Sequence, residues 1–202
     1  ANTNNLVTVT GKAVGTATIT VNFTPTDTTN YNNAVAKTYT ANIRNTATIP
    51  TNSLCKCTGL TTCGSSYSSF AYTGSAQTLT TATSGTGYTL SGYSQTNVNA
   101  SGYTVTATLS SGYRWSDNST GTKTFTCYLP KATPVITLSA TSGDTIVNQT
   151  VTFNEKANVK GKFTVSSSDT TKATVSQASA NEIAANTNNL VTVTGKAVGT
   201  AT

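Results

Sequence analysis

Apolar and polar residues alternate with a period of two along much of the chain. The segments 190–194 (LVTVT) and 18–23 (TITVNF) place apolar side chains between threonines. Such alternation predicts β-strands with one buried face and one solvent-facing face. The same reading predicts strands at 135–138, 150–153, 162–165, 172–175 and 36–43. Glycine-containing breaks separate these segments and no stretch keeps an apolar helical stripe, so the predicted fold class is all-β.

Composition supports this prediction and narrows the function. Thr, Ser and Asn make up 89 of the 202 residues, and the chain contains no His. Threonine favours strands over helices, and a chain without His lacks the usual general base and the commonest metal ligand. We therefore expect a protein that is not an enzyme, with no catalytic residues, no metal site and no cofactor.

The charge pattern indicates neither a nucleic acid nor a membrane as partner. The net charge of +6 is spread evenly, and the closest basic cluster is Lys156, Lys160 and Lys162 beside Glu155. Nucleic-acid proteins concentrate basic residues on one face, so we interpret this cluster as a solvated strand face. No apolar run approaches the roughly 18 residues of a membrane span, so membrane insertion is not expected.

The chain repeats itself. Residues 1–18 and 185–202 both read ANTNNLVTVTGKAVGTAT, at an offset of 184 residues. Identity over this length indicates tandem duplication, and the chain then holds slightly more than one period of a longer array. An artificial overlap of the two segments is the alternative.

The repeat also predicts the domain boundaries. Joining 131–184 to 1–45 gives 99 residues, a usual size for a β-sandwich domain. We therefore expect residues 1–45 to be the C-terminal half of one domain and 46–130 to be a complete module. Residues 131–202 would be the N-terminal part of the next copy of the first domain.

Three segments of the domain that 131–184 and 1–45 would form together carry a family resemblance. The segment 163–176 (FTVSSSDTTKATVS), followed by LVTVTGKAVGTAT and ATITVNF, resembles the bacterial immunoglobulin-like (Ig-like) repeats of group 2. The matching residues are core and turn positions and include no catalytic motif. The resemblance therefore bears on the fold more than on function.

The middle module resembles a second Ig-like type, the YDG/MBG-type repeats. This resemblance rests on the segments 72–79 (YTGSAQTL), 87–92 (GYTLSG), 103–109 (YTVTATL), 112–117 (GYRWSD) and 123–126 (KTFT). The segment 57–69 (CTGLTTCGSSYSS) departs from the pattern as an insertion. Both families occur in long secreted proteins of bacterial surfaces. The resemblance implies tandem Ig-like sandwiches outside the cell, with an incomplete domain at each end.

All four cysteines fall in the middle module. In an Ig-like sandwich the first and last strands can be neighbours, so the resemblance favours a Cys55–Cys127 disulfide, with Cys57–Cys63 closing a local loop. The exchanged pairing, Cys57–Cys127 with Cys55–Cys63, stays open. A four-cysteine zinc site is disfavoured because the cysteine spacing lacks the paired CxxC pattern. Disulfides would indicate an oxidising, extracellular setting.

Tyrosines are concentrated in the same module, and Ser-Gly-Tyr recurs there every ten residues. One interpretation is that each aromatic side chain fills a small core beside a turn glycine. The alternative is an exposed rim that stacks sugars. The candidate ligand-facing residues are Tyr93, Tyr113, Trp115, Asp117 and Asn118.

Taken together, the sequence predicts a non-enzymatic structural repeat of an extracellular bacterial stalk, fibre or filament. An adhesin that binds glycan or host protein through the Tyr-rich module is one alternative, and an Ig-like appendage domain of a phage virion is another. The expected partners are neighbouring copies of the same repeat, in one chain or by strand complementation between chains. A glycan or cell-wall polymer is a further candidate partner.

Overall fold

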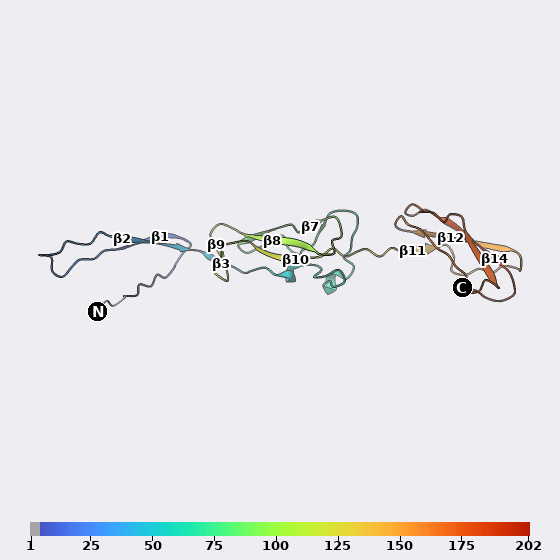
Figure 1. Cartoon of the computed structure of the whole chain (residues 1–202), viewed down its shortest axis with the longest axis horizontal. Coiled ribbons are helices and arrows are strands. Elements are labelled where there is room, and N and C mark those ends of the chain that lie inside the picture. The colour runs from blue at the N-terminus through green and yellow to red at the C-terminus, as the bar shows by residue number, and fades with distance from the viewer. Residues whose placement is uncertain (1–4) are drawn as a thin grey trace. The chain divides into compact units, whose positions relative to one another are not determined.

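The computed structural model describes residues 5–202, which form two compact units divided between Ala132 and Thr133. Strands form five sheets in this part of the chain (Figure 1). Helical structure among residues 5–202 is limited to two single 3-10 turns, η1 (Asn52–Leu54) and η2 (Ser65–Tyr67). The predicted all-β class is confirmed.

The first unit is organised around a four-stranded antiparallel sheet in the order β10-β8-β6-β5. Its strands are β5 (Ser84–Gly85), β6 (Tyr88–Ser91), β8 (Tyr103–Leu109) and β10 (Lys123–Cys127). Along β8, Val105 and Ala107 are buried while Thr104 and Thr108 are exposed. The alternation in the sequence thus becomes one apolar face and one threonine-rich face.

Trp115 is the largest fully buried side chain of the core that covers this apolar face. It belongs to β9 (Tyr113–Trp115), which pairs in parallel with β3 (Asn45–Ala47). A short pair, β4 (Gln77–Thr78) with β7 (Ser94–Gln95), lies in the same unit. The Trp115 ring packs 5.6 Å from the Tyr88 ring, measured between centroids. Leu79, Val105 and Leu129 are fully buried around it.

The first unit also contains a two-stranded hairpin, made by β1 (Gly15–Val21) and β2 (Lys37–Ile43). Ala17 pairs with Ala41 and Ile19 with Tyr39, so these side chains share one face of the hairpin. The alternate pairs, which are threonines and one asparagine, share the other face. Both strands are exposed along most of their length, unlike the strands of the core sheet.

The second unit, residues 133–202, is a four-stranded antiparallel sheet in the order β11-β12-β14-β13. Its strands are β11 (Ile136–Leu138), β12 (Thr150–Ala157), β13 (Ala173–Gln177) and β14 (Asn189–Gly195). The register places Val151, Val193 and Val175 in one row across the apolar face, with threonines on the opposite face.

One predicted strand is absent. Residues 162–165 alternate between half-buried and exposed positions, as a strand would, but they form no strand in the structure. A strand needs a neighbouring strand whose backbone accepts and donates hydrogen bonds in register with its own. The carbonyl of Phe163 is instead bonded to the Gln177 side chain, at 3.3 Å from its Nε2. The prediction at 162–165 was wrong because alternation does not supply a pairing partner.

The recurring Ser-Gly-Tyr triplets mark turns. They occupy 91–93, 101–103 and 111–113, and the φ angles of their glycines lie between 76° and 81°. This is the left-handed region, which glycine enters without strain. The tyrosine after each glycine is half-buried and packs against the core. The triplet therefore has a structural role, a turn followed by an aromatic anchor.

We expect Gly92→Ala to destabilise the first unit and Gly121→Ala to leave it nearly unchanged. A Cβ on Gly92 would meet the Thr104 carbonyl oxygen at 2.6 Å, and the residue has φ of 77°. The left-handed conformation alone costs about 1–2 kcal/mol for a non-glycine residue. A Cβ on Gly121 meets nothing within 4 Å. Urea unfolding followed by the fluorescence of Trp115, the chain's one tryptophan, measures both. Equal midpoints for the two variants would contradict this account.

Candidate functional site

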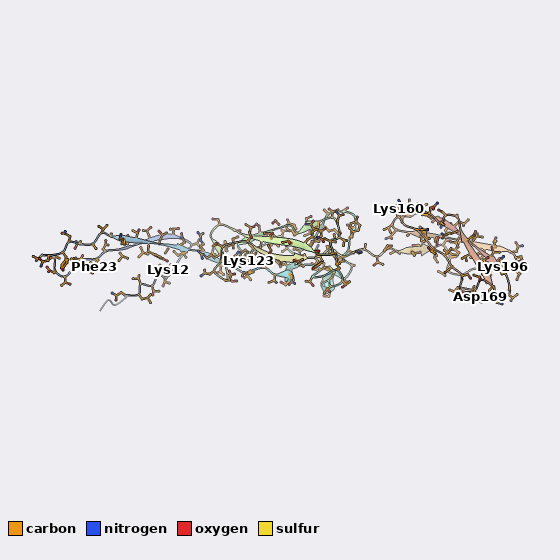
Figure 2. The ribbon with its side chains drawn as sticks, viewed as in Figure 1. Lys12, Phe23, Lys123, Lys160, Asp169 and Lys196 are labelled. Atoms are coloured by element: carbon orange, nitrogen blue, oxygen red, sulfur yellow. A yellow bond between two sulfur atoms is a disulfide. The ribbon has the colours of Figure 1, made fainter. Side chains whose placement is uncertain are left out.

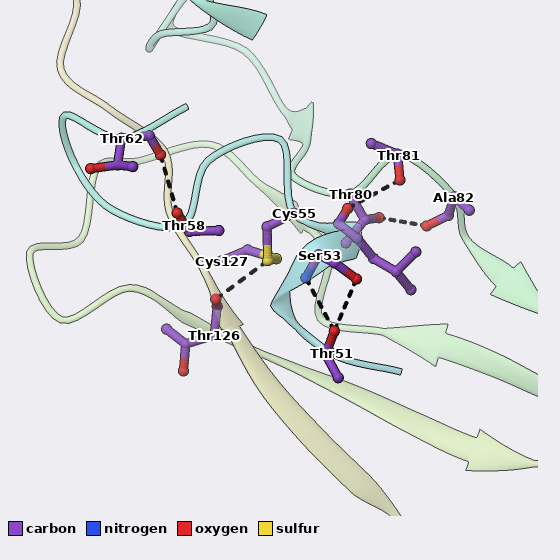
Figure 3. Close-up of a disulfide and its surroundings, with 11 residues drawn as sticks. Thr51, Ser53, Cys55, Thr58, Thr62, Thr80, Thr81, Ala82, Thr126 and Cys127 are labelled. Atoms are coloured by element: carbon purple, nitrogen blue, oxygen red, sulfur yellow. Dashed lines mark hydrogen bonds between the residues drawn. A yellow bond between two sulfur atoms is a disulfide. The ribbon is translucent and has the colours of Figure 1, made fainter. Parts of the chain in front are cut away.

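The most distinctive chemical feature of the first unit is the disulfide between Cys55 and Cys127, shown in Figure 3. Cys55 directly follows η1, and Cys127 is the last residue of β10. Their Cα atoms lie 5.3 Å apart, although 72 positions separate them in sequence. Both residues are buried in the core. The bond therefore joins the beginning of the module to its last strand.

Backbone hydrogen bonds hold the Cys55 segment in place. The amide of Lys56 donates to the Leu79 carbonyl and the amide of Thr81 donates to the Leu54 carbonyl, each at 2.8 Å. The Cys55 sulfur also lies 3.3 Å from the Thr126 carbonyl oxygen (Figure 3). A bridged sulfur carries no hydrogen, so this last approach is a contact and not a hydrogen bond. The disulfide thus sits where residues 54–56, 79–81 and β10 meet.

The second disulfide, Cys57–Cys63, closes a loop only six positions long. The amide of Gly64 donates to the Lys56 carbonyl at 2.9 Å, which ties the far side of this loop to its beginning. The Lys56 ammonium lies 4.9 Å from the centroid of the Phe70 ring, a cation–π distance. The segment 57–69 is therefore a stapled, folded loop. The structure holds this pairing, and the two bonds use all four cysteines of the sequence.

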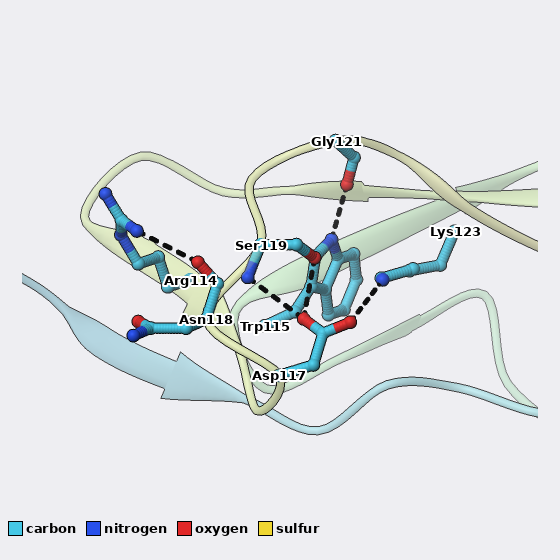
Figure 4. A network of polar contacts seen from close by, with 7 residues as sticks. All are labelled: Arg114, Trp115, Asp117, Asn118, Ser119, Gly121 and Lys123. Atoms are coloured by element: carbon cyan, nitrogen blue, oxygen red, sulfur yellow. Dashed lines mark hydrogen bonds and ion pairs between the residues drawn. The ribbon is translucent and has the colours of Figure 1, made fainter.

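The candidate ligand-facing residues do not form one exposed surface. Trp115 is 1% exposed, and its indole Nε1 donates to the Gly121 carbonyl at 2.5 Å (Figure 4). Trp115 therefore does not belong to a ligand-facing rim, because burial of the ring in the core removes its face from solvent. Tyr93 and Tyr113 are half-buried against the same core. Asp117 and Asn118 are exposed.

Asp117 is the centre of a polar network in the turn after β9, drawn in Figure 4. Its Oδ1 accepts from both the amide and the hydroxyl of Ser119, at 3.0 and 2.6 Å. Its Oδ2 lies 2.5 Å from the Lys123 ammonium. These partners, the Lys123 hydrogen bond first, hold the pKa of the Asp117 carboxyl well below its ordinary value. In this turn the ionised carboxylate is paired with Lys123, so the role of Asp117 here is structural.

In the second unit, Glu155 occupies an unexpected position. The sequence suggested a solvated strand face around Lys156, but the Glu155 side chain is buried on the apolar face of the sheet. The Asn189 side-chain amide donates to Glu155 Oε1 at 2.9 Å, and it also donates to the Ser179 carbonyl. The two-residue alternation along the strand could have indicated this burial. Glu155 follows Val151 and Phe153 at that spacing, so all three side chains point to the same face of the sheet.

The described residues 5–202 contain neither a cluster of metal ligands nor a membrane-spanning helix. No group of three or more Cys, Asp or Glu side chains in this range is placed to hold a metal ion. No helix in the same range is long and apolar enough to cross a membrane. The disulfides and the turn network are thus the main chemical features of the first unit.

The two disulfides should contribute unequally to stability. Loop-closure entropy predicts about 4 kcal/mol for a bond spanning 72 positions and about 2 kcal/mol for one spanning six. We expect the Cys55→Ser/Cys127→Ser variant to lose more unfolding free energy than the Cys57→Ser/Cys63→Ser variant. Urea unfolding of the two variants measures the difference. A larger loss from the local pair would contradict the prediction.

The Asp117 network makes a pH prediction. Because the folded pKa is lowered, ionised Asp117 stabilises the fold above its unfolded pKa, near 3.8, and this contribution is lost as the pH falls through the folded value. We expect an NMR titration of the Asp117 carboxyl to show a midpoint well below 3.8. Lys123→Met should move that midpoint upward, because it removes the largest cause of the shift. A midpoint that Lys123→Met leaves unchanged would show that the ion pair does not form.

Compared with known proteins, the chain matches no family model, no curated protein and no solved structure. The resemblance to bacterial Ig-like repeats therefore stays a prediction. Three features of the chain bear on its function, namely the all-β fold, the two disulfides and the internal repeat. Two disulfides are typical of proteins that work in a non-reducing environment.

Proposed function

We propose that the chain is a non-enzymatic structural repeat of an extracellular stalk, fibre or filament on a bacterial surface, built of tandem Ig-like sandwiches. The observation that carries this proposal is the position of the Cys55–Cys127 bond. It joins a residue near the entry of the module to one near its exit. Such a bond changes how the module responds to a pulling force.

Tension along the polypeptide would enter the module near β3 and leave it after Leu129. Between these points, the covalent path runs from Cys55 directly to Cys127, so residues 56–126 lie outside the line of force. The core around Trp115 lies mostly within this bypassed segment. Because the disulfide carries the tension, the module keeps its length under load. A stalk needs this property.

The surface of the chain supports the same proposal. Charged residues make up only 9% of the sequence, and the exposed sheet faces are lined by threonines. Exposed hydroxyl groups keep the surface hydrated without long-range charge. The exact 18-residue repeat supports an array of copies, which is how a long stalk would be assembled from small domains.

Single-molecule pulling on the 202-residue chain, held at its two ends, tests the proposal. With disulfides intact, we expect residues 56–126 to contribute no extension at forces that leave the covalent bonds intact. Reduction should release the 72-residue span, which at 3.3–3.6 Å per residue is about 250 Å of added contour length.

The matched control is the Cys57→Ser/Cys63→Ser variant, whose missing bond lies inside the protected span. It should extend like the unmodified oxidised chain, whereas Cys55→Ser/Cys127→Ser should extend like the reduced chain apart from the small loop still closed by Cys57–Cys63. Release of about 250 Å from the oxidised chain would overturn the proposed mechanical role.

A further inference from the structure

The β1–β2 hairpin has an apolar face that the described chain leaves largely uncovered. The register pairs Ile19 with Tyr39 on that face, next to Val21. Tyr39 is 63% exposed and Val21 is 51% exposed. Phe23, beyond the end of β1 (Figure 2), is also exposed. A two-stranded hairpin is marginally stable in water unless its apolar face packs against another layer, so this face needs a partner.

The sheet of the second unit also has an apolar face that is only partly covered. Its apolar face is buried at the centre, around Val191, but open along β11. Ile136 pairs with Ala157 and Leu138 with Glu155, which places Ile136 and Leu138 on the same apolar face. Ile136 remains 63% exposed there and Leu138 42%. Apolar surface of this extent on one edge of a sheet indicates a missing second layer.

Residues 161–168 show where the second layer would begin. They alternate between half-buried and exposed positions and belong to no strand, and their one β-bridge pairs Gly161 with Ile183. The amide of Ser168 donates to the Thr202 carbonyl at 2.8 Å, and the amide of Thr202 donates to Ser168 Oγ at 2.9 Å. Through the 18-residue identity, Thr202 corresponds to Thr18, in the middle of β1. The β1 sequence is therefore already in contact with residues 161–168.

The strand order provides independent support. An Ig-type sandwich of seven strands packs a sheet in the order A-B-E-D against a sheet in the order C-F-G. Lettered along the chain, β11, β12, β13 and β14 are A, B, D and E, and their observed order is A-B-E-D. Residues 161–168 fall at the position of C. The two strands that the repeat puts next, with the sequences of β1 and β2, would be F and G.

We propose that the β1–β2 hairpin of one copy of this repeat binds the 133–202 unit of another copy and forms its second sheet, together with residues 161–168. The partner of this apolar face is thus a second copy of the same chain, as a neighbour in the array. In this arrangement the face of the hairpin with Ile19 and Tyr39 packs against the sheet of the 133–202 unit, and the face with the threonines points to solvent. The inference deepens the proposed function and rests on its arrangement of tandem copies.

The test is a chain in which a second copy of residues 19–45 follows Thr202, compared with the 202-residue chain by hydrogen exchange. Strand pairing should slow the exchange of alternate backbone amides among residues 163–168 by about tenfold or more, because an edge strand bonds every second amide to its neighbour and those amides then open only with the sheet. The apolar face around Ile136 should become protected from solvent. Unchanged exchange at 163–168 would overturn the proposal.

Two variants of the appended segment show whether the proposed face makes the contact. Ile19→Asp with Tyr39→Asp places charges on the apolar face and should abolish the slowing. Thr20→Asp with Thr40→Asp places the same charges on the polar face and should preserve it. Equal slowing in both variants would also overturn the proposal. The pulling response depends on Cys55–Cys127 alone, so that result stands or fails separately from this one.

Discussion

Each of the larger sheets in this chain has one apolar face and one threonine-rich face, and the apolar face has to be removed from water. In the first unit Leu90, Val105 and Phe125 meet this requirement by packing with Trp115. Burial of apolar area is worth about 25 cal/mol per Å². The threonines on the opposite face contribute little to that term and keep the sheet soluble. The covering of apolar faces therefore determines which parts of the chain are well packed.

The disulfides complement a core of limited size. A module of about 85 residues buries a smaller fraction of its surface than a large domain does, so its margin of stability is small. The Cys55–Cys127 bond lies within the core cluster itself, beside Leu79 and Leu129. It restricts the unfolded chain without replacing apolar contacts in the folded one. Under tension, the same bond would also shorten the covalent path between Cys55 and Cys127.

Sequence patterns correctly predicted the strands that can be recognised from local alternation alone. The strands around Thr150–Phe153 and Leu190–Thr194 were found because their apolar residues recur with a period of two. The sequence left Trp115 open between a core position and a ligand-facing rim, and it did not predict burial of Glu155, because both positions depend on which segments pack over a face. The strand predicted at 162–165 is absent for a related reason. Their pattern is that of a strand, but pairing depends on a partner far away in sequence.

The repeated segment isolates this dependence on context. Residues 5–11 and 189–195 are identical in sequence, yet only the second copy forms a strand, β14. Val191 is fully buried between β12 and β13, whereas the equivalent Val7 is 66% exposed. Intrinsic propensity is the same in both copies, so the neighbouring strands must supply the difference. A threonine-rich sequence of this kind becomes a strand where another strand is already positioned to pair with it. That is also the physical reason to expect the exposed β1–β2 hairpin to be completed by another copy of its own repeat.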